Sequence, residues 1–300
     1  MVKLASVCMS SHPTDKASNR DAMVAFVEQA ASQNVDMIVF PEECLTGIGT
    51  VSMQQFSGKD KMDMVTELAE QIPSGDSTQL FIELAKKHDM YICWGMAEKD
   101  PDRFDVTYNA AVLVGPEGYI GHYRKVHLPM CERFIHYPGP GDYPVFETRF
   151  GKVGLEICFD KAFPEVARTL ALKGAQIIVN PTAWPNISGK PDDPDKMSYE
   201  TYAHARAMEN MVFFIDSNHC GPYMAGCSQI IGPNPGQKFA VTSPEGGMAV
   251  AEVDIEKEIL NARIFSMGGS DLLKDRKPGT YGEITKFTPY TPYGAVIAQG

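Results

Sequence analysis

The chain has 300 residues, of which 44% are apolar, and its 38 acidic residues outnumber 27 basic ones to give a formal net charge of -11. A chain of this length buries roughly 75% of the surface that its unfolded form exposes, so length and composition predict one large domain of the α/β class. The acidic balance argues against nucleic acid or an anionic membrane as the main partner and favours a small molecule.

Short apolar runs rich in Val and Ile alternate with segments of helical period in the first half of the chain. This alternation is typical of strands that are joined through helices. Ser18 followed by Asp21 resembles a capping box and predicts a first helix with Met23, Val27 and Ala30 on its apolar face. The other elements expected here are strands at residues 3–9, 36–40 and 90–96, helices over 64–72 and 80–85, and a hairpin that turns at 115–118.

The second half of the chain shows the same alternation. Residues 153–157 predict a strand, and Pro164 and Gly174 predict the start and the C-terminal cap of the helix after it. The remaining expected elements are a strand at 175–180, a helix over about 195–210, and strands at 212–217, 228–232 and 248–254. Two similar halves predict two sheets with helices on their outer faces.

The domain organisation follows from composition along the chain. No linker composition divides the sequence, so a single domain over residues 1–300 is expected. Residues from about 266 to 300 mix Gly, Pro and aromatic residues without periodicity, which predicts an arm that packs on a partner subunit.

Membrane and redox signals are weak in this sequence. The N-terminal stretch MVKLASVCMSSHPTDK has only a short apolar patch, and nowhere do about 18 apolar residues run together. The seven cysteines are scattered and form no CxxC pair, which favours free thiols in a reducing compartment over a disulfide framework. We therefore expect a soluble, cytoplasmic protein.

Three reactive side chains follow predicted strands. In open α/β sheets the carboxyl ends of strands form the crevice where ligands bind. Glu42 follows the strand DMIVF, Lys125 ends the hairpin, and Cys158 follows the strand VGLEI, so a carboxylate, an ammonium group and a thiol are expected to converge. Each has another interpretation: a helix cap for Glu42, a solvated charge for Lys125 and a small core residue for Cys158.

The chemistry of these three groups is complementary. A thiol at the start of a helix and beside an ammonium group has its thiolate favoured by the dipole and the charge, so we expect Cys158 to be a nucleophile. A glutamate partly buried between strands, Glu42, can accept the thiol proton and pass it to a leaving amine. Lys125 and the backbone N–H of Phe159 could together stabilise an oxyanion.

These residues lie in three motif blocks that resemble the carbon-nitrogen hydrolases of the nitrilase superfamily. The blocks are FPEECLTG at 40–47, YRKVHLP at 123–129 and GLEICFDKAFPEVARTLALKGAQIIVNPTAW at 154–184, and they occur in the family's order. The likeness also takes in Tyr108-Asn109 and extends over roughly residues 3–255. It implies a four-layer αββα sandwich of two mixed, mostly antiparallel sheets, and a homodimer or higher homo-oligomer in which sandwiches stack.

The resemblance also implies roles for individual residues. Carried over by position, Glu42 is the general base, Lys125 is the oxyanion-stabilising lysine and Cys158 is the nucleophile. A second glutamate of this family helps to position substrate and falls a few residues after the lysine motif, where Glu132 is the best candidate. An ordinary loop charge is the other interpretation of Glu132.

Departures from the family pattern bear on the substrate. The family's true nitrile hydrolases generally carry Trp-Glu directly after the cysteine, whereas this chain has Phe159 and Asp160, which favours amides over nitriles. Lys161 stands where many relatives hold an apolar residue or an arginine. We expect it to be a solvated charge at a helix start, with attraction of a substrate carboxylate as the alternative. Trp184 is a candidate pocket wall, although a packed core indole is nearly as good an interpretation.

Two other chemistries use residues near the same motifs. A papain-like Cys-His hydrolase would take His127 or His122 as its base, but it would leave the Glu42 motif unexplained. We interpret His127 as a hydrogen-bonded core residue. A zinc site lacks paired-ligand spacing in both sets that the sequence offers, which are His127 with Cys131 and His219 with Cys220 and Cys227.

The sequence thus predicts a thiol-dependent amidase that uses no cofactor and no metal. Cys158 would attack the carboxamide carbon of a small amide, and Glu42 would pass the proton to the departing ammonia and then activate water against the thioester. An N-carbamoyl amine or amino-acid hydrolase is the alternative with the same triad. A catalytically silent binding protein and an acyltransferase are the alternatives of other classes.

Overall fold

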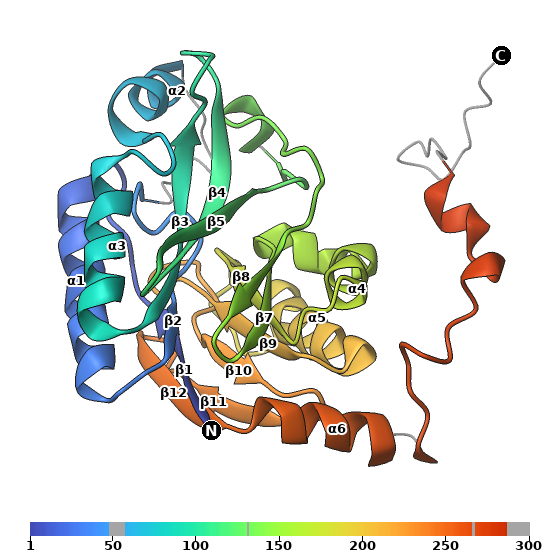
Figure 1. Cartoon of the computed structure of the whole chain (residues 1–300). Helices are drawn as coiled ribbons and strands as arrows, with labels where there is room; N and C mark the ends of the chain where they lie inside the picture. The colour runs from blue at the N-terminus through green and yellow to red at the C-terminus, as the bar shows by residue number, and fades with distance from the viewer. Residues whose placement is uncertain (48–57, 131, 266–267, 287–300) are drawn as a thin grey trace, which may run out of the picture.

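Two six-stranded mixed sheets lie face to face, and helices cover the outer face of each (Figure 1). The computed structural model describes residues 1–47, 58–130, 132–265 and 268–286. The strand order is β12-β1-β2-β3-β4-β5 in the first sheet and β11-β10-β9-β8-β7-β6 in the second. The predicted four-layer αββα sandwich is therefore confirmed.

The first sheet and its helices come mainly from the N-terminal half of the chain. Its strands are β1 (Val2–Cys8), β2 (Met37–Val39), β3 (Tyr91–Lys99), β4 (Thr107–Gly115), β5 (Gly118–Arg124) and β12 (Gly247–Val253). The helices on its outer face are α1 (Lys16–Ser32) and α3 (Asp76–His88), with the short α2 (Gly58–Asp63) and the π-helical turn η2 (Met64–Leu68) near one end.

The second sheet comes from the C-terminal half. Its strands are β6 (Val145–Thr148), β7 (Gly151–Leu155), β8 (Ile177–Pro181), β9 (Phe213–Ser217), β10 (Gln229–Ile231) and β11 (Lys238–Val241), and it is covered by α4 (Pro164–Leu172) and α5 (Pro194–Asn210). The 3-10 turns η3 (Glu132–Phe134) and η4 (Cys158–Ala162) lie in the connections, and α6 (Ile255–Phe265), η6 (Pro278–Thr280) and η7 (Gly282–Thr285) follow the sandwich.

Each sheet is built around three parallel strands, β1-β2-β3 in one and β7-β8-β9 in the other. Their apolar residues read as continuous buried runs because such strands are covered on both faces. Side chains from the two facing surfaces, including Leu4, Val39, Leu155, Val179 and Ile215, form one fully buried core between the sheets. This core fixes the two sheets against each other, and the carboxyl ends of β2 and β7 with them.

The local signals for helices are mostly confirmed, with one displaced start. Helix α1 begins at Lys16, and its N-cap is Asp15, whose carboxylate accepts the N–H of Ser18 at 3.0 Å. The expected cap at Ser18 is therefore wrong, because Asp15 already satisfies that donor. Helix α4 begins at Pro164 as predicted, and Gly174 takes a φ of 98° just beyond its end.

The segment after α6 runs along the outside of the sandwich, where Leu273 packs against the core formed by α4, α5 and the second sheet. It corresponds to the described part, residues 268–286, of the arm expected over 266–300; residues 266–267 and 287–300 lie outside the described residues. Packing of this arm on a partner subunit stays a prediction. Among the described helices, none is long and apolar enough to cross a membrane.

Candidate active site

Two carboxylates share one buried ammonium group where the strands of the first sheet end. Glu42 lies just beyond β2, and Lys125 follows β5 directly. The Lys125 Nζ atom is 2.6 Å from Glu42 Oε1 and 2.7 Å from Glu132 Oε2. The side chains of Lys125 and Glu42 are 1% and 2% exposed, and that of Glu132 is 12% exposed, so the solvated-charge interpretations of Lys125 and Glu132 do not hold.

Asn109 on β4 completes this cluster. Its Nδ2 donates to Glu42 Oε1 and to Glu132 Oε1, both at 2.8 Å. Tyr108-Asn109 is part of the family likeness, but the sequence pattern predicts no role for Asn109. The available signal was an amide in the otherwise apolar strand NAAVLV, since a buried amide must find polar partners.

The main chain of Glu42 is held as closely as its side chain. Its N–H donates to the Thr182 carbonyl at 3.4 Å, and its carbonyl accepts from His219 Nε2 at 2.7 Å. Gly95 on β3 allows this packing, because a Cβ there would come within 2.6 Å of the Glu42 Cα atom. A glycine inside a strand indicates such a close approach, and the sequence reasoning did not use this signal.

The electrostatics of the cluster follow from its burial. Burial opposes the charge on Lys125, but the carboxylates of Glu132 and Glu42 outweigh it and hold the pKa of Lys125 well above its ordinary value. For Glu132, burial is the largest cause and the nearby Glu42 charge adds to it, so its pKa is raised to about 7 although Lys125 acts in the other direction.

Cys158 follows an extended residue and opens the five-residue 3-10 turn η4. Its φ of 49° lies in the left-handed region, which is costly for a residue with a Cβ and is often found at functional sites. Strand-to-helix elbows that expose a nucleophile share this arrangement.

The thiolate form of Cys158 is not favoured in this environment. Burial raises the pKa of the thiol, the Glu42 charge raises it further, and Lys125 only partly opposes them. The expectation of a thiolate stabilised at a helix start is therefore wrong: the turn is one short 3-10 segment, and desolvation dominates. The resting form is a thiol, which needs a base.

These groups border one cavity of about 530 Å³. Its lining includes all six residues that the sequence singled out for the site: Glu42, Lys125, Glu132, Cys158, Phe159 and Trp184. Apolar residues from η2 and from the loop after β5 form much of the remaining wall: Met64, Leu68, Leu128, Met130 and Ile135. A carboxylate, an ammonium and a thiol thus meet beside a largely apolar chamber.

Trp184 is both a cavity wall and a packed indole. The residue is 7% exposed, and its Nε1 donates to the Asp195 carbonyl at 2.8 Å and to Ser198 Oγ at 3.1 Å. Its backbone N–H donates to Asn218 Oδ1 at 2.8 Å. The two interpretations that the sequence left open are therefore compatible.

Comparison with known proteins identifies the family of the chain. The carbon-nitrogen hydrolase profile matches residues 3–260. The chain belongs to the carbon-nitrogen hydrolase family. A nitrilase of Pyrococcus abyssi is 35% identical over 285 residues, covering 94% of this chain and 99% of its own, and an (R)-stereoselective amidase of Pseudomonas sp. is 29% identical over 290 residues, covering 95% of each.

A solved structure gives the same fold. It is a variant of the amidase from Nesterenkonia sp. AN1 with acrylamide added to its active-site cysteine, and it superposes with a TM-score of 0.76 at 21% identity, covering 95% of this chain and 100% of that one. This carbon-nitrogen hydrolase is thus an enzyme that acts on carbon-nitrogen bonds other than peptide bonds.

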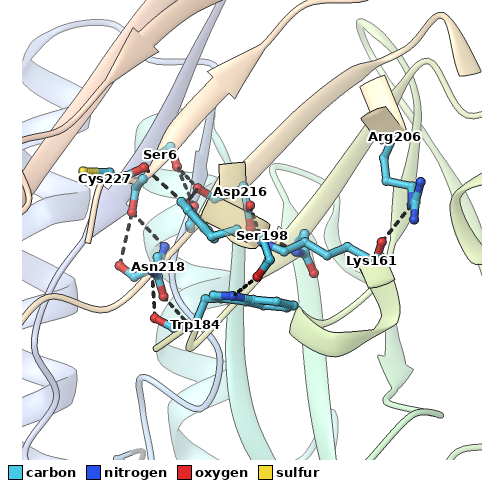
Figure 2. Close-up of polar contacts among 12 residues, drawn as sticks. Ser6, Lys161, Trp184, Ser198, Arg206, Asp216, Asn218 and Cys227 are labelled. Atoms are coloured by element: carbon cyan, nitrogen blue, oxygen red, sulfur yellow. Dashed lines mark hydrogen bonds and ion pairs between the residues drawn. The ribbon is translucent and has the colours of Figure 1, made fainter. Parts of the chain in front are cut away.

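Lys161 of this hydrolase is not the solvated charge that the sequence predicted. It is 0% exposed, and its Nζ is 2.6 Å from Asp216 Oδ2 on β9 (Figure 2). It does not line the cavity either, so the alternative of a carboxylate-attracting group at the pocket mouth is also wrong. Burial lowers the pKa of Lys161 and raises that of Asp216, and each partner opposes the shift of the other.

The histidines of the Cys-His alternative lie elsewhere. His127 Nδ1 is 2.7 Å from Asp160 Oδ1, and its ring stacks on Phe163 with a centroid distance of 3.8 Å. His122 contacts Tyr119 and Glu98. Neither histidine lines the cavity, which removes the basis for a Cys-His pair.

The zinc alternative also finds no support in the geometry. Cys131 lies outside the described residues. Within the described part of the chain, no three His, Cys, Asp or Glu side chains are grouped so that they could hold a metal ion.

Proposed function

We propose that this carbon-nitrogen hydrolase is a thiol-dependent amidase that converts a small carboxamide to a carboxylic acid and ammonia. The observation that carries the proposal is the convergence of Cys158, Glu42 and Lys125, from the ends of three strands in two sheets, on one cavity. A nucleophile, a base and a cation in one desolvated chamber are what acyl transfer to a thiol requires.

In the first step Glu42 takes the proton from the Cys158 thiol as Sγ bonds to the amide carbon. A base is needed because burial raises the thiol pKa. The carbonyl oxygen becomes an oxyanion, which the Lys125 ammonium and the backbone N–H of Phe159 stabilise. Glu42 then gives its proton to the nitrogen, the carbon-nitrogen bond breaks, and ammonia leaves a thioester on Cys158.

In the second step water replaces ammonia. Glu42 accepts a proton from water as its oxygen attacks the thioester carbon, and the carbon-sulfur bond breaks to release the carboxylic acid. The Cys158 sulfur takes the proton back from Glu42, which restores the resting thiol. Glu132 and Asn109 hold Lys125 and Glu42 in place through both steps. Glu132 accepts a hydrogen bond from Lys125, and Asn109 donates one to Glu42 and one to Glu132.

The cavity supports an amide with a modest apolar acyl group. Its walls are mostly apolar and its volume suits a small molecule. Asp160, which takes the place of the glutamate of true nitrile hydrolases, accepts hydrogen bonds from Tyr123, His127 and the Ile157 N–H and does not line the cavity. It therefore offers no group to a nitrile.

The test is ammonia release from aliphatic and aromatic amides, matching nitriles and N-carbamoyl amino acids. We expect the wild type to release ammonia from amides and Cys158→Ala to release none. The matched control is Cys227→Ser, since Cys227 is a half-buried free thiol that does not line the cavity, and it should keep wild-type activity.

Other outcomes identify the competing functions. Release of both ammonia and carbon dioxide from N-carbamoyl compounds would replace the amidase by a carbamoyl hydrolase. Formation of a hydroxamate in the presence of hydroxylamine without free acid would indicate an acyltransferase. Activity that survives in Cys158→Ala would contradict the proposed mechanism altogether.

A further inference from the structure

A buried cation that the proposed mechanism does not use lies behind the cavity wall. The Lys161 Nζ atom is 4.0 Å from the centroid of the Tyr199 ring and 4.5 Å from that of Trp184. Its only salt bridge within the described residues is with Asp216, at 2.6 Å. Lys161, Asp216 and Tyr199 are all 0% exposed.

Stability alone does not account for this ion pair. Moving two charges out of water has a large desolvation penalty, and apolar residues of similar volume often serve a core as well or better. An ammonium over the face of an indole is, in contrast, a directional contact that grows stronger when it is desolvated. The placement of Lys161 relative to the site is therefore the informative feature.

Lys161 belongs to the same turn as Cys158. Its carbonyl accepts from Arg206 Nε at 2.7 Å, and the next carbonyl, that of Ala162, accepts from Arg206 as well (Figure 2). Helix α5 thus holds the backbone of η4 through Arg206. The Lys161 side chain leaves this fixed turn and reaches the indole that lines the cavity beside Cys158.

The indole is restrained at its edge by other residues. Its Nε1 donates to Asp195 and Ser198 on α5, and its backbone is bound to Asn218. The Tyr202 ring also packs against the indole in a T-shaped arrangement, with a centroid distance of 5.9 Å. The contact with Lys161 is the one that ties the ring face to the nucleophile turn.

We propose that Lys161 is a positioning residue that sets acyl-group selectivity by holding the Trp184 ring as a fixed wall beside Cys158. This inference rests on the proposed amidase function. Its substrate consequence is specific: amides whose acyl group reaches Trp184 depend on Lys161, and the smallest amides do not.

The test variant is Lys161→Met with Asp216→Asn, which removes both charges together and keeps side-chain volume. The amide oxygen introduced by Asp216→Asn can still accept from Asn180, which donates to the Asp216 carboxylate at 2.9 Å in the wild type. Lys161→Arg, which keeps a cation, is the rescue variant. Phe214→Leu is the control for stability, because Phe214 lies close to Asp216 on β9 but packs in the core on the outer face of the sheet.

The kinetic readout compares acetamide with the largest acyl amide that the wild type hydrolyses. In the double variant we expect KM for the large amide to rise roughly 5- to 30-fold, the range of a desolvated cation–π contact, with kcat and KM for acetamide unchanged. Lys161→Arg should recover most of the loss, and Phe214→Leu should show none. Equal losses for both amides, or none for either, would overturn the proposal.

A second readout does not depend on turnover. The chain has two tryptophans, and Trp94 is fully buried in the first sheet's outer core. In a Trp94→Phe background, iodide quenching reports on Trp184 alone and should increase in the double variant but not in Phe214→Leu. If no amide is hydrolysed, the amidase proposal fails, but the quenching measurement still tests the positioning role of Lys161. Unchanged quenching of Trp184 in the double variant would overturn that role.

Discussion

Protonation of Glu132 changes how the Lys125 ammonium is held in the site. Its carboxylate is one of two that hold the Lys125 ammonium, and burial raises its pKa to about 7. Below that pH Glu132 becomes neutral, so the Lys125 ammonium loses one of the two carboxylates that hold it beside the cavity. We expect kcat/KM to rise with pH through an inflection near 7, measured as ammonia release from one amide across about pH 5 to 9.

The variant Glu132→Gln separates this group from others that titrate nearby. It fixes a neutral partner beside Lys125, so activity should be lower than that of the wild type above about pH 7, and the inflection should disappear. An unchanged inflection in Glu132→Gln would assign the titration to another group.

The variant Asn109→Ala tests whether catalysis requires the hydrogen-bond donor that Glu42 and Glu132 share. Asn109→Ala removes hydrogen bonds of 2.8 Å to Glu42 and to Glu132. Hydrogen bonds to charged groups contribute about 1.5–3 kcal/mol each, so loss of one such contribution in the transition state lowers kcat roughly 10- to 150-fold. Single-turnover ammonia release is the measurement, and KM should change little because Nδ2 of Asn109 is bound to the two carboxylates rather than left for a substrate.

Ser6→Ala is a suitable control for Asn109→Ala. Ser6 is also buried and hydrogen-bonded between the sheets, to Ser217 at 2.7 Å, but it does not line the cavity. A similar fall in kcat in this variant would indicate that Asn109 matters only for the fold.

At the scale of elements, Asp160 anchors the turn η4 from inside the fold. Asp160 is 0% exposed and accepts from the Tyr123 hydroxyl at 2.8 Å, the Ile157 N–H at 3.1 Å and His127. Asp160→Ala leaves these donors without their acceptor and should lower the free energy of unfolding by about 3 kcal/mol. Urea unfolding measures this loss, and Asp192→Ala, at an exposed position, should show almost none.

The sequence reasoning did not predict the helix α6 or the outer strands of the second sheet. β6 and β11 are four residues each and only partly buried, so they carry no apolar run for a pattern to detect. The segment 64–72 was predicted as an amphipathic helix, but its helical part ends at Leu68 as a π-helical turn. Central strands were predicted because burial on both faces leaves a continuous apolar signature.

At the scale of the molecule, the sequence located the reactive groups but not their environment. Glu42, Lys125 and Cys158 were predictable because each follows a buried strand, and strand ends converge. The burial of Lys161 was not predictable, since its partner Asp216 lies 55 positions away and on another element. The raised pKa of Cys158 likewise depends on desolvation by the assembled sheets.

The quaternary structure is a proposal that the exposed C-terminal region can test. We propose a homodimer, as the family resemblance implies. Leu260, Ile264 and Phe265 of α6 are 56%, 49% and 74% exposed, so this helix presents apolar side chains that a partner subunit could cover. Light scattering should give the mass of a dimer for the full chain and that of a monomer for a chain truncated after Phe265. An unchanged mass would show that the arm does not hold the assembly together.

The placement of Glu42 and Cys158 on different sheets has a consequence for how activity arises during folding. Neither half of the chain contains both groups, and the contacts between their strand ends, such as Glu42 with Thr182, join residues far apart in sequence. A nascent or partly folded chain therefore carries an ordinary, unpaired thiol. Glu42 and Cys158 come together only when the two sheets pack against each other. In a refolding experiment, the onset of activity therefore marks the time at which the two halves of the chain meet.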